Sequence, residues 1–513
     1  MRRAPSRPWL IRSLLLCGLM LAAWTIDDTS PVAAFDMVHG GQPGALTGPV
    51  ISGPAAGHES LRPAPPPMGG VFIARPPYGS GWPRHPPIAG GLVGGGNGNG
   101  GLGRGRNSGG NNNNGPTASG GQPRFVSDEV ITEFVSSATP QAIDQIARRY
   151  GLTRLESENF ELIGGSLYRW RIAGRRSVAN VVRALGTERL VASVQPNYIF
   201  TLQEQASKVQ VPEAQADKAP VGAAGDPAQY VLTKLQVEQA RQMATGKNVL
   251  VAVIDSEIDA KHPDLDGAVV KSFEALDGAK DAHGHGTAIA GAIASHGKLL
   301  GIATGAKLLA VHAFDDTPGK ANGTSFAIYK GLQWAVDNEA RVVNMSFVGP
   351  ADPALRRILA AAYDKGTVLV AAAGNAGPHS KPLYPAADPD VIAVTATDAD
   401  DHLFAMANRG RYIAVAAPGV DILALAPGGA YQITTGTSIA AAHVSAVAAL
   451  LLERSPSLKP SDIRAALIAT AERLGPIVPD SDFGAGLVNA YRALTWLDRR
   501  PAEPNDGAAQ AKQ

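Results

Sequence analysis

The chain has 513 residues, which is enough for more than one domain, and 46 lysine and arginine residues nearly balance 45 aspartate and glutamate residues. The resulting net charge of +1 gives no electrostatic argument for binding nucleic acid or an acidic membrane surface. Cys17, the only cysteine, lies in an apolar N-terminal segment, so a mature protein without that segment would have neither a disulfide nor thiol chemistry.

The N-terminus has the layout of a secretory signal. Arginines at positions 2, 3, 7 and 12 precede an apolar run from Leu14 to Trp24, and Val32-Ala33-Ala34 follows it. A retained signal-anchor is the alternative, but roughly a dozen apolar residues are few against the ~20 that a membrane-spanning helix needs. The layout predicts a signal peptide over residues 1–34 and a secreted or periplasmic protein.

Residues 35–122 are rich in glycine, proline and asparagine and hold few apolar side chains. Such a composition buries too little surface to offset the entropy cost of ordering, which predicts a disordered segment. The polar residues 498–513 predict a disordered tail.

Residues 123–203 predict a small α+β domain. Thr139 caps and Pro140 opens a helix that Gly151 ends, and Ser177 starts a second helix. Alternating or extended patterns predict four strands, so the order is βαββαβ, a ferredoxin-like split βαβ sandwich. The four expected strands are Glu129–Phe134, Leu152–Leu162, Ser166–Ile172 and Leu190–Phe200.

Residues 204–228 show little periodicity and are interpreted as a linker, the kind of exposed segment in which proteases cut. In residues 229–497, continuous apolar runs alternate with helical patterns, which predicts an α/β domain with a doubly wound parallel sheet. The six expected buried strands are Asn248–Ile254, Lys307–Ala313, Arg341–Met345, Thr367–Ala373, Val391–Thr395 and Ile413–Ala416.

Four polar residues follow strands or begin helices in this domain. Asp255 ends the first strand, where a carboxylate faces the ligand-binding crevice of a doubly wound sheet, although a helix cap or turn is an equal reading. His285 opens a helix of small residues, and Asn375 follows another strand, where it is either an oxyanion donor or a turn residue. A zinc site at His283 and His285 with Asp281 nearby lacks a clear further ligand set.

Ser438 precedes a long apolar helix pattern, in Gly436-Thr437-Ser438-Ile439-Ala440. The free backbone N–H groups and the positive dipole at a helix start favour negative charge on a neighbouring oxygen, as acyl transfer requires, although a simple N-cap is the common role of such a serine. Ser325 stands in the same Gly-Thr-Ser-x-Ala pattern and is interpreted as a cap of an amphipathic helix.

Three of these residues follow one another in the Asp, His, Ser chain order of one triad type, namely Asp255, His285 and Ser438. Asn375 lies between His285 and Ser438 in the chain. With these blocks the chain resembles the subtilisin-like serine proteases from about Gln229 to Leu497. The resemblance extends to four further segments, Val342-Val343-Asn344-Met345-Ser346, Tyr384-Pro385-Ala386, Ala417-Pro418-Gly419 and Phe483-Gly484-Ala485-Gly486-Leu487-Val488-Asn489-Ala490.

The resemblance implies that Ser438 is the nucleophile, His285 the general base and then acid, and Asp255 the carboxylate that orients the imidazole. Asn375 and the Ser438 N–H would form the oxyanion hole, where losing one side-chain donor costs roughly 100-fold or more, the value known for subtilisin itself. The implied substrate-binding residues are Ser346, Phe347, Val348, Gly349, Ala373 and Gly374.

The same resemblance makes residues 123–203 similar to a propeptide that assists folding and blocks the cleft until it is cut away. It implies a secreted, self-processed serine endopeptidase that acts on proteins or peptides, with its own propeptide as a partner in cis and no metal or cofactor. A catalytically silent or permanently autoinhibited binding protein on the same fold is the alternative. An esterase of another α/β class is disfavoured, because Gly-x-Ser-x-Gly is absent and the triad order differs.

Some positions depart from the family pattern. Glu257 stands where a glycine is usual, two residues after Asp255, and is expected to point the same way and to raise the pKa of one of the two carboxyl groups. Ala288 and Ala442 replace a usual histidine and proline, which affects packing more than chemistry. Val348 replaces a glycine beside the specificity pocket. This predicts a narrowed pocket and a preference for substrates with a small P1 residue, the residue before the cut bond. The segment between Gly291 and Gly301 is short for the calcium loop of some relatives.

Overall fold

The computed structural model describes residues 124–203, 205–211, 226–276, 284–315, 321–475 and 480–499. The expected signal peptide, the segment 35–122 and the tail from residue 500 onward lie outside these ranges. Asp281 and His283 of the weighed zinc site also lie outside them.

The N-terminal domain has the expected order of strand, helix, strand, strand, helix, strand. Thr139 and Ser177 cap the two helices, accepting hydrogen bonds from the backbone N–H groups of Ala142 and Asn180. The four strands form an antiparallel sheet in the order β4, β1, β3, β2. The elements are β1 (Phe125–Phe134), α1 (Pro140–Arg149), β2 (Leu152–Phe160), η1 (Glu161–Ile163), β3 (Gly165–Ile172), α2 (Val178–Leu185) and β4 (Val191–Leu202).

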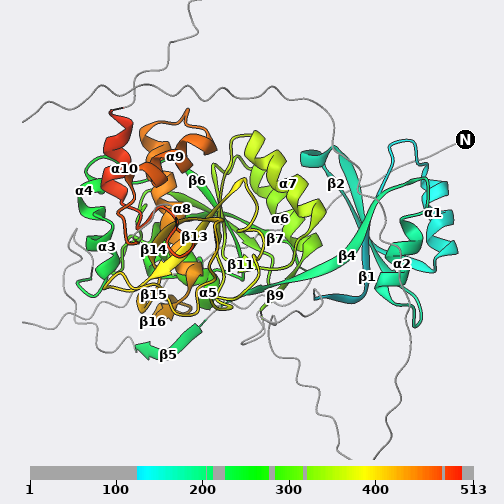
Figure 1. Ribbon diagram of the computed structural model, residues 1–513, viewed down its shortest axis with the longest axis horizontal. Coiled ribbons are helices and arrows are strands. Elements are labelled where there is room, and N and C mark those ends of the chain that lie inside the picture. The colour runs from blue at the N-terminus through cyan, green and yellow to red at the C-terminus, as the bar shows by residue number, and fades with distance from the viewer. Residues whose placement is uncertain are drawn as a thin grey trace, which may run out of the picture. The chain divides into compact units, whose positions relative to one another are not determined.

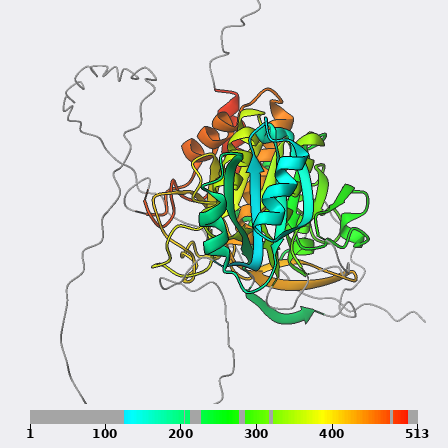
Figure 2. The same ribbon diagram turned by 90° about the vertical axis from the view of Figure 1, so that its right-hand side faces the viewer.

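The two faces of this sheet are buried against different partners, because successive side chains of a strand point to opposite faces. Val130 packs with α1 and α2, which lie along one face of the sheet (Figure 1, Figure 2). Its neighbour Ile131 belongs to a second core shared with helices of the larger domain, together with Phe200 of β4. The small domain therefore depends on the larger one to cover one face of its sheet.

The larger domain is built on a seven-stranded parallel sheet in the order β14, β13, β12, β10, β6, β8, β7. Six of these strands are the six expected ones, which confirms the α/β fold prediction. The additional strand β7 lies at the edge and has no buried residue, so its sequence lacks a continuous apolar run. The bounds are β6 (Leu250–Asp255), β7 (Val269–Glu274), β8 (Lys307–His312), β10 (Val342–Met345), β12 (Val368–Ala372), β13 (Val391–Thr397) and β14 (Ile413–Pro418).

Helices cover both faces of this sheet, as two separate hydrophobic cores show. One core contains α5 and α8 and the other contains α6 and α7. The helices are α3 (Tyr230–Lys234), α4 (Val237–Arg241), α5 (Gly284–Ala294), α6 (Ser325–Asp337), α7 (Pro353–Asp364), α8 (Thr437–Arg454), α9 (Pro460–Thr470) and α10 (Ala490–Leu497), with a short η3 (Pro263–Leu265). Within the described part of the chain, α8 alone has the length and composition of a membrane span, and 89% of it is buried inside the protein.

Short strands complete the fold near the carboxyl ends of the parallel strands. They are β9 (Asn322–Thr324), β11 (Phe347–Val348), β15 (Ile422–Ala426) and β16 (Ala430–Thr435). The interpretation of 204–228 as a featureless linker is wrong in part, because Gln205–Val211 forms strand β5, antiparallel to β16. Without β5, β16 would be an edge strand, and the backbone of an edge strand can pair with almost any extended segment, so pairing of this kind leaves little signal in composition.

The expected cap at Ser325 is also wrong. Thr324 caps α6, with its hydroxyl accepting from the N–H of Ala327. Ser325 is the first helical residue, and its Oγ donates to Asp352 at 2.6 Å and accepts from the N–H of Tyr198 in the N-terminal domain at 3.2 Å. Because the cap lies one residue earlier than expected, the Ser325 hydroxyl is left to contact the N-terminal domain.

Candidate active site

Asp255 and His285 meet where β6 ends and α5 begins. Their Oδ1 and Nδ1 atoms are 2.7 Å apart, and both side chains are buried. Asp255 Oδ1 also accepts from the backbone N–H of Ser256 at 2.8 Å, which fixes the carboxylate. Gly286 makes this approach possible, because a Cβ atom there would lie 2.4 Å from the backbone oxygen of Ser256. A carboxylate held against Nδ1 leaves Nε2 as the imidazole nitrogen for proton transfer.

Ser438 is the second residue of α8, and Gly436 is the N-cap residue, two positions before the serine that was considered as a cap. The Ser438 Oγ lies 3.3 Å from the backbone oxygen of Ser346. The Ser346 hydroxyl in turn donates to the Ser438 carbonyl at 3.0 Å. Ser438, His285 and Gln203 line the same recess of roughly 220 Å³. The structure thus brings the predicted nucleophile and base to one small site at a helix N-terminus.

Asn375 is oriented by its neighbour across the site. Its Oδ1 accepts from the backbone N–H of Thr437 at 3.0 Å and from the Thr437 hydroxyl at 2.8 Å. Because a backbone N–H can only donate, the oxygen of the amide must face Thr437, and the Nδ2 donor must face the cleft. There Nδ2 donates to the backbone oxygen of Gln203 at 2.9 Å. This is the geometry of an oxyanion-hole donor on a peptide carbonyl.

The carbonyl belongs to the end of β4, which leaves the N-terminal domain and enters the site (Figure 1). Thr201 pairs with Val348 of β11 and Phe200 with Gly323 of β9, both in antiparallel register. The N–H of Leu202 donates to the Ala321 oxygen at 3.1 Å. The segment therefore lies as an extended strand between two strands of the larger domain and ends with the Gln203 carbonyl at Asn375.

Phe200 is the buried anchor of this segment. Its ring meets the ring of Phe347 edge to face, with centroids 5.9 Å apart, and the residue is fully buried. Gly349 leaves the space for the ring, because a Cβ atom at that position would lie 2.2 Å from Phe200 Cδ1. Phe347 and Gly349 were both predicted as substrate-binding residues.

The other predicted substrate-binding residues lie around the same strand end. Val348 pairs with Thr201, and its Cγ1 would lie 3.3 Å from a Cβ atom on Gly374. The Ala373 carbonyl accepts from Asn408 Nδ2 at 2.9 Å. Ser346 lies under Ser438, as described above. The structure therefore brings together every residue of the predicted site.

Three contributors were not predicted. Thr437 orients Asn375, and Asn408 holds the adjoining loop by donating to the Ala373 carbonyl and accepting from the Ala376 N–H, each at 2.9 Å. Gln203 was placed at a domain end without a role. The role of Thr437 could have been predicted, because it stands next to Ser438 in the motif. The role of Asn408 could not, because it contacts residues more than thirty positions away and its local sequence does not indicate these contacts.

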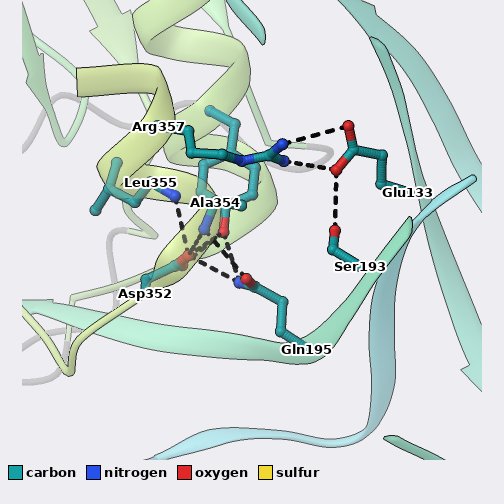
Figure 3. A network of polar contacts seen from close by, with 8 residues as sticks. Glu133, Ser193, Gln195, Asp352, Ala354, Leu355 and Arg357 are labelled. Atoms are coloured by element: carbon teal, nitrogen blue, oxygen red, sulfur yellow. Dashed lines mark hydrogen bonds and ion pairs between the residues drawn. The ribbon is translucent and has the colours of Figure 1, made fainter. Parts of the chain in front are cut away.

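The N-terminal domain also contacts the larger domain away from the cleft (Figure 3). Gln195 of β4 donates to Asp352, the residue that caps α7, at 2.8 Å. Arg357 of α7 forms an ion pair of 2.6 Å with Glu133 of β1. The first contact is buried and the second is partly exposed to solvent.

Glu257 was expected to point the same way as Asp255, and this expectation is wrong. Strand β6 ends at Asp255, and the Glu257 carboxylate lies 3.5 Å from Nδ1 of a different histidine, His312, which also contacts Glu274 at 2.7 Å. Among the described residues these three side chains form a group whose ligand atoms lie within 4.8 Å of one another, the spacing of a metal site. Carboxylates also pair with histidine without an ion, and we assign no metal there.

Comparison with known proteins agrees with this geometry. The model of the subtilase family matches residues 246–486. Thermitase from Thermoactinomyces vulgaris is 36% identical over 276 residues, which cover 52% of this chain and 96% of thermitase. Subtilisin E from Bacillus subtilis is 39% identical over 48% of this chain and 66% of its own length.

Two further relatives cover more of the chain. A thermophilic serine proteinase from Bacillus sp. strain AK1 is 31% identical over 72% of this chain and 88% of its own length. The crystal structure of fervidolysin from Fervidobacterium pennivorans, described as a keratinolytic enzyme related to subtilisin, matches with a TM-score of 0.63 and 26% identity, over 72% of this chain and 61% of fervidolysin. The chain belongs to the subtilase family of serine endopeptidases.

Proposed function

We propose that the protein is a secreted serine endopeptidase, made as a zymogen that cuts itself at the peptide bond after Gln203. The observation that carries this proposal is the hydrogen bond of 2.9 Å from Asn375 Nδ2 to the Gln203 carbonyl, in the recess that Ser438 and His285 line. A strand held in this way presents its carbonyl as a substrate does.

The chemistry follows from these positions. Ser438 Oγ attacks the Gln203 carbonyl carbon while His285 Nε2 takes the hydroxyl proton, and Asp255 stabilises the imidazolium that forms. Asn375 Nδ2 and the Ser438 N–H stabilise the negative charge on the carbonyl oxygen. His285 then gives the proton to the leaving amine of Glu204, and water hydrolyses the acyl-enzyme in a second round that restores Ser438.

The extensive contact of residues 125–203 with the larger domain supports a propeptide role for this domain. The buried Phe200 ring and the Gln195 contact with Asp352 would keep the cut domain bound as an inhibitor. The same contacts favour the alternative of a permanently autoinhibited protein if release never occurs. The signal-like residues 1–34 support export, to the periplasm or the medium.

The test compares wild type, Ser438→Ala and the exposed-serine control Ser457→Ala by intact mass and N-terminal sequencing after expression with the signal segment. Wild type and the control should carry a new N-terminus at Glu204 and react with a fluorophosphonate. Ser438→Ala should do neither, and its mass should show removal of residues 1–34.

Two results would contradict the proposal. Wild type that stays uncut and unlabelled would establish a silent protein. Wild type that is labelled but cut elsewhere would leave the endopeptidase activity in place and refute processing after Gln203.

A further inference from the structure

The side chain of Gln203 is held as specifically as its backbone. Its Oε1 accepts a hydrogen bond from the backbone N–H of Asn375, while the Asn375 side chain donates to the Gln203 carbonyl at 2.9 Å. One residue of the larger domain thus binds both oxygens of Gln203. The backbone N–H is a fixed donor, since its position depends on the chain path and not on a side-chain rotamer.

Close contacts around Gly374 limit the space beside Asn375. A Cβ atom on Gly374 would lie 3.3 Å from Val348 Cγ1 and 2.4 Å from Asn408 Nδ2, so both side chains lie close to the Gly374 backbone. Val348 is 2% exposed, and Asn408 is held by two hydrogen bonds of 2.9 Å. A long side chain that needs depth between these side chains meets Val348 and Asn408.

We propose that this site selects glutamine at P1, the residue before the cut bond, through the Asn375 backbone N–H and a pocket that Val348 makes shallow. The inference rests on the proposed function and names its substrate class. It replaces the expectation of small P1 residues, because a small side chain gives the Asn375 N–H no acceptor.

Other side chains are disfavoured for separate reasons. Methionine matches glutamine in length but has no strong acceptor, and phenylalanine needs the depth that Val348 removes. Glutamate offers an acceptor but sets a full negative charge beside the carbonyl oxygen on which negative charge develops. A site built to bind one polar atom rejects analogues that lack it.

The test measures kcat/KM of the self-processed enzyme on fluorogenic peptides Phe-Thr-Leu-X, taken from residues 200–203, with X as Gln, Met, Glu, Ala or Phe. The kcat/KM for the Gln peptide should exceed that for each of the others by about tenfold. A tenfold ratio corresponds to roughly 1.4 kcal/mol, which is the contribution of one hydrogen bond. Equal rates for Gln and Met, or a preference for Ala or Phe, would overturn the inference.

Val348→Gly should raise kcat/KM for X = Phe at least tenfold relative to kcat/KM for X = Gln, because the pocket becomes deeper. Val270→Gly, at an exposed valine of edge strand β7, is the matched control and should keep the wild-type order of peptides. If Val348→Gly fails to fold, the peptide series with the wild-type enzyme still tests whether glutamine is selected at P1.

Fluorophosphonate labelling separates the two levels of the argument. Labelled enzyme that prefers another P1 residue refutes glutamine selection and leaves the proposed function standing. An enzyme that is not labelled and cuts none of the peptides refutes the proposed function and the selectivity that rests on it.

Discussion

Thr437 shows how one residue beside the nucleophile arranges the charge-stabilising group. Its hydroxyl donates to Asn375 Oδ1 at 2.8 Å and accepts from the Gly374 N–H at 3.0 Å. Its own backbone N–H, one of the free donors at the start of α8, is satisfied by the same Asn375 oxygen at 3.0 Å. Thr437 therefore links the helix that carries Ser438 to the loop that carries Asn375.

His443 is a buried histidine of α8 that takes no part in the proposed chemistry. Burial lowers its pKa from 6.5 to about 4, although the Pro418 carbonyl, 2.9 Å from Nδ1, favours the protonated form in part. Between these two pH values the unfolded chain binds a proton that the folded protein does not. The contribution of this residue therefore makes the folded protein less stable as pH falls from 6.5 toward 4.

We expect the free energy of unfolding to lose roughly 3 kcal/mol over this window through His443 alone. The measurement is urea unfolding from pH 7 to pH 4 in a Ser438→Ala background, which prevents self-digestion. His443→Gln should flatten this part of the pH dependence, and replacement of the exposed His379 by glutamine should not. An unchanged slope in His443→Gln would mean that this histidine is not held neutral by burial.

At the scale of elements, the site depends on how closely α5 lies against the end of β6. We expect Gly286→Ala to reduce kcat/KM at least tenfold, because the added Cβ would lie 2.4 Å from the Ser256 oxygen and must displace His285 from Asp255. Overpacking of this kind should also cost about 1–3 kcal/mol of stability.

Gly284→Ala is the matched control for this change. Its Cβ would first meet the flexible end of the Gln432 side chain at 3.3 Å, so activity should stay within a few-fold of wild type. Peptide hydrolysis and thermal unfolding measure both effects. Equal activity of the two variants would show that the contact with Ser256 does not position the base.

Much of the arrangement of elements could be predicted from the sequence, for physical reasons. The six central strands are buried on both faces, so each reads as a continuous apolar run, as in Val391–Thr397. Asp255, His285, Asn375 and Ser438 could be named because each stands in a short motif at a strand end or helix start.

The rest could not be predicted, because it depends on contacts between distant segments. Strand β5 is defined by backbone pairing with β16, and the role of Gln203 depends on reaching Asn375, 172 positions away. Glu257 was expected beside the triad because two-residue spacing in a strand implies a shared face, and β6 ends before that rule applies.

At the scale of the whole molecule, the proposed inhibition by the N-terminal domain would depend on buried contacts more than on surface charge. We expect Phe200→Ala to weaken binding of the cut domain about 100-fold, since the fully buried ring is worth roughly 3 kcal/mol. The lag between self-cutting and the appearance of peptidase activity should shorten accordingly.

Arg357→Ala is the comparison, because this arginine is 45% exposed where it pairs with Glu133. A surface ion pair contributes at most about 1 kcal/mol, so the lag should change less than fivefold. Time courses of cleavage and activity from the same sample measure both variants. A larger effect for Arg357→Ala than for Phe200→Ala would make surface charge the main source of inhibition.

Strand β5 would give the proposed processing step a property that a cut in a free linker would lack. It begins at Gln205, just after the bond to be broken, and Gln205 already pairs with Thr435 beside the site, while Gln203 is hydrogen-bonded to Asn375 on the other side. A nick at this bond would create two ends that are both still held by the larger domain. Such ends could be resealed by the reverse reaction, so the proposed maturation would become irreversible only when one of them leaves.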